Sequence, residues 1–198
     1  MPEAQKLREF KFKGQRVYVH GSDFFDSISL FLKSRGDGFI KGLTFRLFTE
    51  KQCKIHLDTL TTSATKVICQ GRWQNIKDGS DTKFWITEMN EAVVNRYGFD
   101  EDSLCQGAQI NDTRIYHRFN PEFTMIENVV ALTKYYHNTQ MTLSSGKWVF
   151  GQIVLGEELL PKCETIEIDN YQNIKDRFSR SYILLDGRKV GEIRFIVS

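Results

Sequence analysis

A short strand followed directly by a long amphipathic helix occurs twice in this sequence, about one half-length apart. This pattern limits the possible folds more than any other feature. In the second copy, a strand at 114–117 precedes Asn120-Pro121-Glu122, which is typical of a helix start because Asn caps and Pro fits the first helical position. In the first copy, a strand at 16–19 precedes Ser22 or Asp23 as the cap. Superposing Arg16 on Arg114 aligns Val17/Ile115, Tyr18/Tyr116, Phe25/Phe123, Ile28/Ile126, Phe31/Val129 and Leu32/Val130. The sequence therefore indicates an internal duplication.

The rest of each half consists mainly of predicted strands. In the first half we expect strand segments within 9–19, a helix at 23–34, strands near 39–47, 53–57, 67–73 and 82–89, and a short helix at 90–97. In the second half we expect a strand near 108–117, a helix at 121–138 and strands near 148–155, 163–170, 180–185 and 190–197, the last two joined by an Asp186-Gly187 hairpin.

Several finer features follow from the same patterns. On the strand at 53–57, alternation places Cys53, Ile55 and Leu57 inward and Lys54 and His56 outward. A polar loop is expected at 59–65. The acidic, glycine-flanked segment 98–106 is the predicted linker, which divides the chain into units 1–97 and 107–198.

Composition and motifs exclude several classes of function. With 27 basic and 25 acidic residues the net charge is +2, so no strong field points to nucleic acid. The sequence has no apolar run long enough to span a membrane and no apolar signal segment near its start, and we expect a cytoplasmic protein. The four cysteines are scattered and are expected to be reduced thiols. Neither metal-ligand spacing nor a glycine-rich phosphate loop occurs, so no metal and no cofactor are predicted.

The order of elements resembles that of the hotdog fold, in which a long helix is wrapped by an antiparallel sheet. An amphipathic helix covered by a sheet is one of the few arrangements that hides both apolar surfaces. Two copies resemble a double hotdog, an α+β architecture with two long central helices wrapped by a continuous antiparallel β-sheet. The resemblance covers most of residues 9–198. A pair of separate α+β domains is the alternative, whereas a lipocalin-like barrel has no place for two mid-chain helices.

This resemblance implies an acyl-thioester substrate, carried by coenzyme A or by an acyl carrier protein. The implied activity is that of a hydro-lyase, converting 3-hydroxyacyl to enoyl thioesters in fatty-acid, polyketide or secondary metabolism. A non-catalytic binding or partner subunit and an acyl thioesterase are the alternatives. A homodimer, or pairing with another hotdog protein, is also implied.

The resemblance also assigns the candidate site. In the dehydratase branch, a His just before the helix of one unit abstracts the α-proton, and an acid on the other unit's helix protonates the departing hydroxyl. The matching residues here are His20 and Glu127, with His117 and Asp26 as the alternative pair. The His-Pro-Gly sequence usual in that branch is absent.

The residues around His20 are the expected substrate contacts. Gly21 lets a backbone N–H approach a thioester carbonyl closely, and Ser22 and Phe25 are expected to contact the substrate as well. In a thioesterase, Asp26 or Glu127 would instead activate water.

Structural roles compete with these assignments. Glu127 can pair with Lys134 or Arg118 as a solvated helix residue, and Asp26 can complement the helix dipole. Basic residues at Lys11, Lys13 and Arg16, and again at Arg177, Arg180, Arg188 and Lys189, suit either an acidic carrier protein or a solvated sheet edge.

Overall fold

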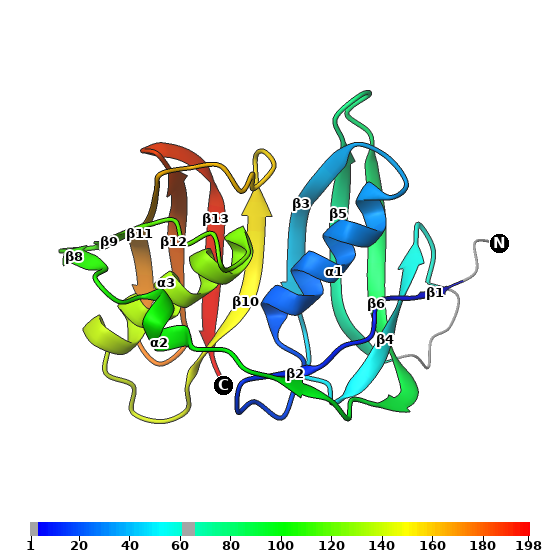
Figure 1. Ribbon diagram of the computed structural model, residues 1–198, viewed down its shortest axis with the longest axis horizontal. Coiled ribbons are helices and arrows are strands. Elements are labelled where there is room, and N and C mark those ends of the chain that lie inside the picture. The colour runs from blue at the N-terminus through cyan, green and yellow to red at the C-terminus, as the bar shows by residue number, and fades with distance from the viewer. Residues whose placement is uncertain (1–3, 61–65) are drawn as a thin grey trace. The chain divides into compact units, whose positions relative to one another are not determined.

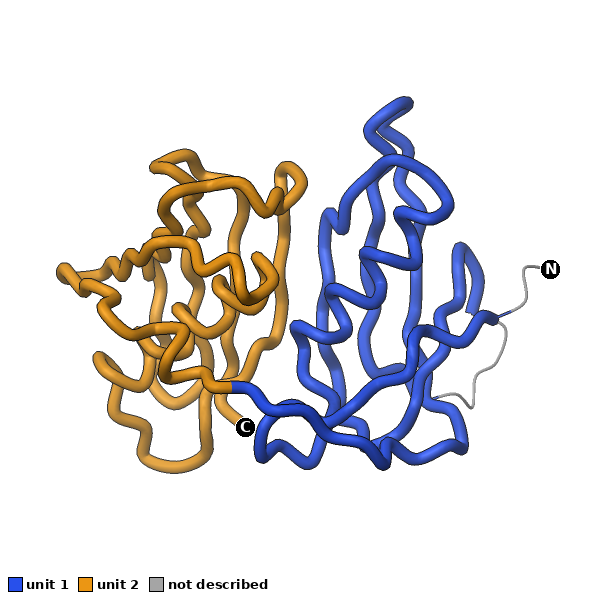
Figure 2. Tube along the Cα trace, viewed as in Figure 1, with its two compact units in different colours: residues 1–99 blue, residues 100–198 orange. Residues whose placement is uncertain are grey.

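The computed structural model describes residues 4–60 and 66–198. The chain divides into two compact units, Met1–Phe99 and Asp100–Ser198 (Figure 2). In the described part of the chain, none of the helices has both the length and the apolar character needed to cross a membrane.

The first unit places one helix against an antiparallel sheet. Its elements are β1 (Gln5–Lys6), β2 (Phe12–Lys13), α1 (Gly21–Lys33), β3 (Gly38–Phe45), β4 (Lys51–Leu57), β5 (Val67–Asn75), β6 (Asp81–Ala92) and β7 (Arg96–Tyr97). The sheet order is β1-β4-β6-β5-β3, and all neighbours are antiparallel. The short strands β2 and β7 form a separate parallel pair. Helix α1 lies across one face of the sheet, in contact with β3 (Figure 1).

The core of this unit forms between α1 and the sheet. Phe24, Ile28 and Leu32 lie three or four residues apart on α1 and are buried. The Phe24 ring lies 4.7 Å from that of Phe10, centre to centre. The sheet contributes buried apolar side chains, namely Ile40, Leu43, Ile55, Phe84 and Ile86. Because each such side chain contributes roughly 1.5–3 kcal/mol on burial, this interface holds α1 in place.

The second unit repeats the plan with a larger sheet. Its elements are α2 (Glu101–Leu104), β8 (Gln109–Asn111), β9 (Arg114–Arg118), α3 (Met125–Gln140), β10 (Trp148–Leu155), β11 (Thr165–Ile174), β12 (Phe178–Leu185) and β13 (Arg188–Val197). The antiparallel order is β10-β13-β12-β11-β9-β8. Helix α3 contacts β9, β10 and β11, and the sheet curves around it (Figure 1). The predicted Asp186-Gly187 hairpin is confirmed, since both residues have positive φ and Leu185 pairs with Arg188.

Both long helices begin elsewhere than predicted. Helix α1 begins at Gly21 with His20 as its N-cap, not at 23 with Ser22 or Asp23. Helix α3 begins at Met125 with Thr124 as its N-cap. Asn120 instead closes a turn before the helix, where its side chain accepts a hydrogen bond from the Glu122 N–H at 3.0 Å. A capping side chain accepts from any unpaired N–H nearby, and for Asn120 that N–H belongs to the turn and not to the helix.

Two predicted elements of the first unit are wrong. The segment 16–19 is not a strand, and pairing there is limited to β2, so only the second copy of the repeated pattern has its strand. The helix predicted at 90–97 is absent, because β6 pairs with β4 as far as Ala92 and β7 follows. Pairing along a sheet overrides the weak helical preference of this sequence. The polar loop predicted at 59–65 lies mostly outside the described residues.

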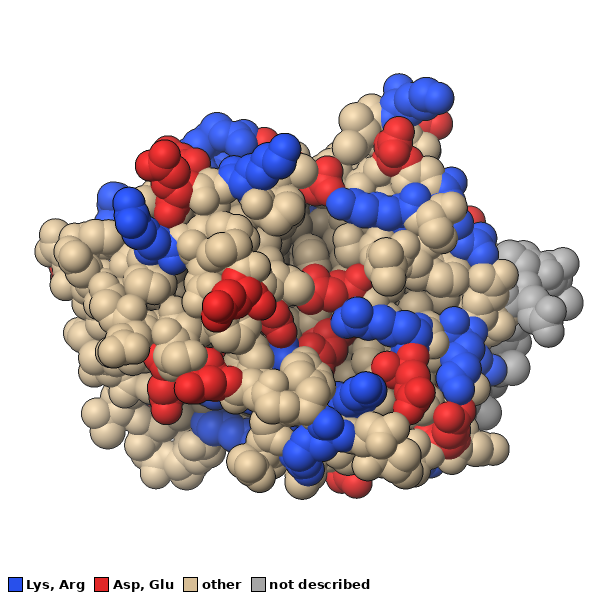
Figure 3. Space-filling view, in the orientation of Figure 1, with Lys and Arg blue, Asp and Glu red and all other residues tan. Residues whose placement is uncertain are grey.

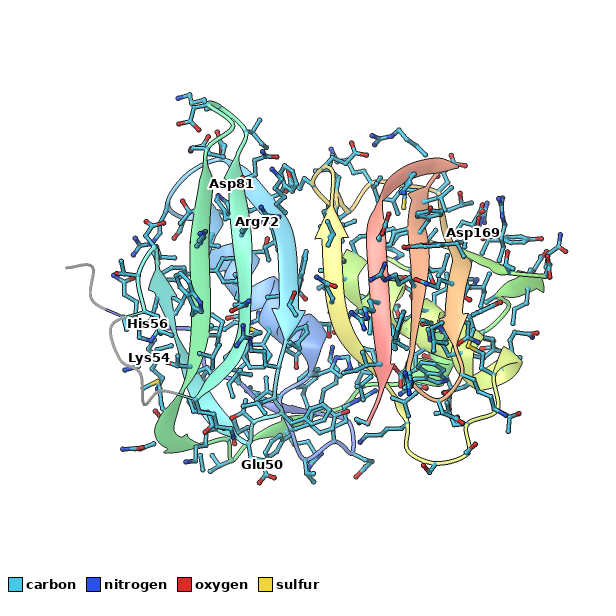
Figure 4. The ribbon with its side chains drawn as sticks, turned by 180° about the vertical axis from the view of Figure 1, so that it is seen from behind. Glu50, Lys54, His56, Arg72, Asp81 and Asp169 are labelled. Carbon is cyan, nitrogen blue, oxygen red and sulfur yellow. The ribbon has the colours of Figure 1, made fainter. Side chains whose placement is uncertain are left out.

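His56 does not face solvent as predicted. It lies beside Lys54 on β4 (Figure 4), yet it is only 8% exposed and its Nε2 lies 2.9 Å from the Thr87 hydroxyl. Burial, followed by the charge of Lys54, lowers the pKa of His56. The predicted linker also contains structure: α2 is one turn capped by Asp100, and the adjoining Leu104 and Cys105 are buried. Of the helices described, only α1 and α3 exceed a single turn.

Candidate functional site

A buried polar cluster surrounds the N-terminus of α1, and we call it the α1 cluster. It consists of Lys13 from β2, Tyr97 from β7, and His20, Ser22 and Asp23 at the helix start. The parallel pairing of β2 with β7 sets Lys13 opposite Tyr97 and so brings residues far apart in the sequence to the same place. Except for the half-buried Tyr97, all members are buried.

Lys13 is the centre of the α1 cluster. Its side chain is 0% exposed, and its ammonium lies 3.0 Å from Asp23 Oδ1 and 2.7 Å from Ser22 Oγ. The same ammonium lies 4.4 Å from the centre of the Phe99 ring. A charge removed from water in this way is tolerated only when it is paired and hydrogen-bonded. Lys13 meets both conditions, because Asp23 pairs with its charge and Ser22 accepts a hydrogen bond from it.

One carboxylate oxygen of Asp23, Oδ1, has two partners. Oδ1 accepts a hydrogen bond from the Tyr97 hydroxyl at 2.8 Å, in addition to its contact with Lys13. Oδ2 is buried, and among the described residues it has no hydrogen-bond partner. The carboxylate also lies in the first turn of α1, where the helix dipole favours negative charge.

His20 is the residue of the predicted site that the structure places most clearly. As the N-cap it has extended backbone angles, and its Nδ1 accepts a hydrogen bond from the Ser22 N–H at 3.4 Å. Its Nδ1 also lies 2.8 Å from Ser22 Oγ. The side chain is 8% exposed. The structure therefore brings two predicted site residues, His20 and Ser22, into direct contact.

The other predicted residues of the first unit lie along α1. Gly21 is the first residue of the helix and is half-buried. Phe25 is buried, and Asp26, one residue further along, is half-buried. The N–H groups of the first helical turn point away from the helix toward its N-terminus, which is a favourable place for a developing negative charge.

In the second unit, Glu127 has a defined structural role. It is the third residue of α3, and its Oε2 accepts a hydrogen bond from the Thr124 N–H at 2.8 Å. The Glu127 N–H donates to Thr124 Oγ1 at 3.3 Å, which completes a capping box. Sequence reasoning gave a solvated pair with Lys134 or Arg118 as the alternative role of Glu127, and Lys134 pairs with Glu101 at 2.6 Å.

His117 lies on β9, opposite Ile166 of β11, and is half-buried. Burial lowers its pKa. His20 and Asp26 belong to the first unit, and Glu127 and His117 to the second. The pairings of His20 with Glu127 and of Asp26 with His117 therefore stay predictions.

Another buried histidine, His137, was not among the predicted site residues. His137, in the last turn of α3, is fully buried, and its Nε2 lies 2.7 Å from Ser179 Oγ on β12. Its ring stacks on Trp148 at 4.6 Å, centre to centre. Burial lowers the pKa of His137 to about 3, so its imidazole is neutral at physiological pH.

Sequence reasoning missed Lys13, Asp23 and Tyr97 as site residues. Lys13 was grouped with Lys11 and Arg16 in an exposed basic cluster, and this grouping is wrong because Lys13 is fully buried. No local pattern distinguishes Lys13 from Lys11, since the partners that bury it come from the helix start and from residues 97–99. Within the described residues, no group of three His, Cys, Asp or Glu side chains is arranged to hold a metal ion.

Comparisons with known proteins place the fold. No protein-family model matches the chain, and no curated protein matches it in sequence. The dehydratase domain of PpsC from Mycobacterium tuberculosis, in complex with C12:1-CoA, aligns with 100% of this chain and 91% of its own, at 11% identity and a TM-score of 0.50. That domain is a hotdog-fold protein. This chain has the hotdog fold.

Two other hotdog structures align over most of the chain. The dehydratase-cyclase domain in ambruticin biosynthesis covers 92% of this chain and 83% of its own, at 9% identity and a TM-score of 0.48. A putative thioesterase II from Thermobifida fusca covers 92% and 88%, at 10% identity and a TM-score of 0.46. The two longest helices described are α1 and α3, of which α1 contacts β3, and α3 contacts β9, β10 and β11.

Proposed function

We propose that this chain binds and processes acyl thioesters, and that its reaction is the dehydration of a 3-hydroxyacyl to an enoyl thioester. The observation that carries this proposal is the full-length likeness to a dehydratase domain whose structure holds C12:1-CoA. The buried histidine that caps α1 supports it, because its ring lies where the helix dipole favours developing negative charge.

The chemistry requires three things of the protein. A base must take the α-proton, a donor must protonate the departing hydroxyl, and the thioester oxygen must be stabilised as negative charge develops on it. His20 and Glu127 are the proposed acid–base pair. The N–H groups at the start of α1, beginning with Gly21, are proposed to face the thioester oxygen. Phe25 completes the proposed contacts with the substrate.

The test is a product assay with matched substrates. The protein is incubated with 3-hydroxydodecanoyl-CoA and with dodecanoyl-CoA, while enoyl formation and free thiol are followed separately. We expect the enoyl product from the first substrate and no thiol from either. Thiol release from both substrates would replace dehydration by thioester hydrolysis. Binding without either product would leave a non-catalytic acyl-thioester protein.

Two further arms of this experiment identify the acyl carrier and test the role of His20. The same acyl group is presented on coenzyme A and on an acyl carrier protein, and the higher kcat/KM identifies the physiological carrier. His20→Gln should reduce enoyl formation by about 100-fold or more, which is the usual contribution of a positioned acid or base. His56→Gln is the matched control, because His56 is equally buried but lies on β4 against Thr87.

A further inference from the structure

The α1 cluster contains a continuous chain of hydrogen bonds that ends on His20. Lys13 Nζ lies 2.7 Å from Ser22 Oγ, and Ser22 Oγ lies 2.8 Å from His20 Nδ1. Lys13 and Ser22 are 0% exposed and His20 is 8% exposed. Sequence reasoning treated Ser22 as a candidate helix cap and a substrate contact, and Lys13 as a surface charge.

The direction of each hydrogen bond in this chain follows from what the groups can donate. An ammonium only donates, so Ser22 Oγ accepts from Lys13. A backbone N–H also only donates, so His20 Nδ1 accepts from the Ser22 N–H. Nδ1 therefore carries no proton in the neutral ring, and the Ser22 hydroxyl donates to it. The neutral imidazole then holds its proton on Nε2.

We propose that Lys13, Ser22 and His20 form a proton relay that makes His20 the proton donor of the reaction. This inference rests on the proposed function and reverses the role of His20 expected from the family resemblance. A neutral histidine with its proton on Nε2 cannot accept the α-proton at that atom. It can instead protonate the hydroxyl that leaves the β-carbon.

A carboxylate, for which Glu127 is the candidate, takes the α-proton while the Cα–Cβ double bond forms and the Cβ–O bond breaks. The departing hydroxyl takes the Nε2 proton of His20 and leaves as water. The Ser22 hydroxyl proton moves to Nδ1, and an ammonium proton of Lys13 replaces it on Ser22 Oγ. Afterwards the carboxylate releases its proton to solvent, and a solvent proton at Nε2 restores the relay in the reverse direction.

Lys13 is the end of this relay, and the loss of its proton leaves the charge of Asp23 uncompensated only until the proton returns. Asp23 Oδ1 at 3.0 Å and the Tyr97 hydroxyl that donates to it keep the carboxylate hydrogen-bonded. Lys13 and Ser22 are therefore positioning residues, which act through His20 and not on the substrate directly.

The first experiment reads the tautomer of His20 without any substrate. Nitrogen-15 NMR of the histidine side chains at a pH where the ring is neutral distinguishes a protonated Nδ1 from a protonated Nε2, and loss of one signal set in His20→Gln assigns it. We expect Nε2–H in the wild type. A proton on Nδ1 would overturn the relay, whatever the outcome of the activity assays.

The second experiment compares two leaving groups. Ser22→Ala breaks the relay, and Ser27→Ala is the matched control because Ser27 is a buried hydroxyl one turn along α1 and outside the chain of hydrogen bonds. We expect Ser22→Ala to lower kcat for 3-hydroxyacyl-CoA by about 100-fold with little change in KM. Elimination of chloride from 3-chloroacyl-CoA, measured above the uncatalysed rate, needs no proton donor and should stay near the wild-type rate.

Other outcomes are equally decisive. Equal losses for both leaving groups, or equal behaviour of the Ser22 and Ser27 variants, would overturn the relay. The double variant Lys13→Met/Asp23→Asn removes the proton source without stranding a buried charge, and it should reproduce the leaving-group selectivity of Ser22→Ala. If the wild type eliminates neither group, the proposed function fails, and the tautomer measurement still decides the direction of the hydrogen bonds.

Discussion

The Lys13 ammonium and the Asp23 carboxylate form an ion pair almost entirely out of contact with water, with side-chain exposures of 0% and 8%. Removing one partner of such a pair leaves an uncompensated buried charge, which costs more than the pair contributes to stability. We therefore expect Lys13→Met to lower the free energy of unfolding by about 3–5 kcal/mol. Urea unfolding of the variant and of the wild type measures this loss.

The double variant Lys13→Met/Asp23→Asn is the control for that prediction. It removes both charges and keeps an oxygen that can accept from the Tyr97 hydroxyl. It should therefore be clearly more stable than Lys13→Met alone, because no unpaired charge remains in the interior. A single variant as stable as the double one would show that water reaches Asp23.

The buried His137 should make the stability of the folded protein depend on pH. Its pKa in the folded protein is about 3, because burial disfavours the imidazolium, whereas the unfolded chain has an ordinary histidine pKa near ~6.5. Below that value the unfolded chain binds a proton that the folded protein does not. Stability should therefore fall as the pH drops from about 6.5 toward 3, by up to about 1.4 kcal/mol per pH unit from this group.

Replacement of His137 isolates this contribution. His137→Phe leaves the Ser179 hydroxyl without its partner, so the variant should be less stable at neutral pH. Its stability should nevertheless depend less steeply on pH than that of the wild type. Urea unfolding at several pH values between 4 and 8 provides the comparison, and parallel curves for the two proteins would contradict the assignment.

At this scale, sequence reasoning located His20 and Ser22 but not their partners. A His three residues before a predicted helix can be recognised locally, because the helix start is encoded nearby. The burial of Lys13 depends on β7, whose pairing with β2 joins residues more than eighty positions apart. No pattern within a few residues of Lys13 contains that information.

At the scale of elements, two variants at the start of α3 can separate the structural role of Glu127 from its proposed chemical role. Thr124→Ala removes the side-chain acceptor of the capping box and should cost about 1 kcal/mol. Glu127→Gln should leave stability nearly unchanged, because glutamine can make the same return hydrogen bond to the Thr124 N–H. Thermal and urea unfolding of the two variants test this difference.

The same pair of variants bears on the proposed chemistry. If Glu127 takes the α-proton, Glu127→Gln should lose enoyl formation while keeping its stability. Thr124→Ala should lose stability while keeping most of its activity at low temperature. Full activity in Glu127→Gln would confine this residue to capping the helix.

The elements that could be predicted from sequence are those with a strong local period. The helical stripes of α1 and α3 and the alternation along β10, β12 and β13 correspond to predicted segments within a few residues. The failures occurred at 16–19 and 90–97, where the chain has little periodicity and long-range pairing decides the conformation. Helix starts were displaced because several capping side chains compete within a few residues of each other.

At the scale of the whole molecule, each unit contains one long helix packed against antiparallel strands. The duplicated pattern in the sequence predicted this repetition, since it preserved the apolar positions of both helices. Charged side chains of both signs are interspersed on the face shown in Figure 3, in keeping with the small net charge. The α1 cluster was not encoded in a comparable way, because it joins residues distant in the sequence.

Binding of an acyl thioester should stabilise the folded chain as a whole. A ligand that binds only the folded state adds about 2.7 kcal/mol at one hundred times its Kd. For a protein of this size each kcal/mol raises Tm by about 2–4 °C, so a saturating acyl-CoA should raise it by roughly 5–10 °C.

Dodecanoyl-CoA is the probe, since it is not expected to be dehydrated. Free coenzyme A and free dodecanoate, tested together at the same concentrations, are the controls. A larger shift from the thioester than from its two parts indicates a site that recognises the linked ligand. Equal shifts would mean that the hotdog fold of this chain is used for a ligand of another kind.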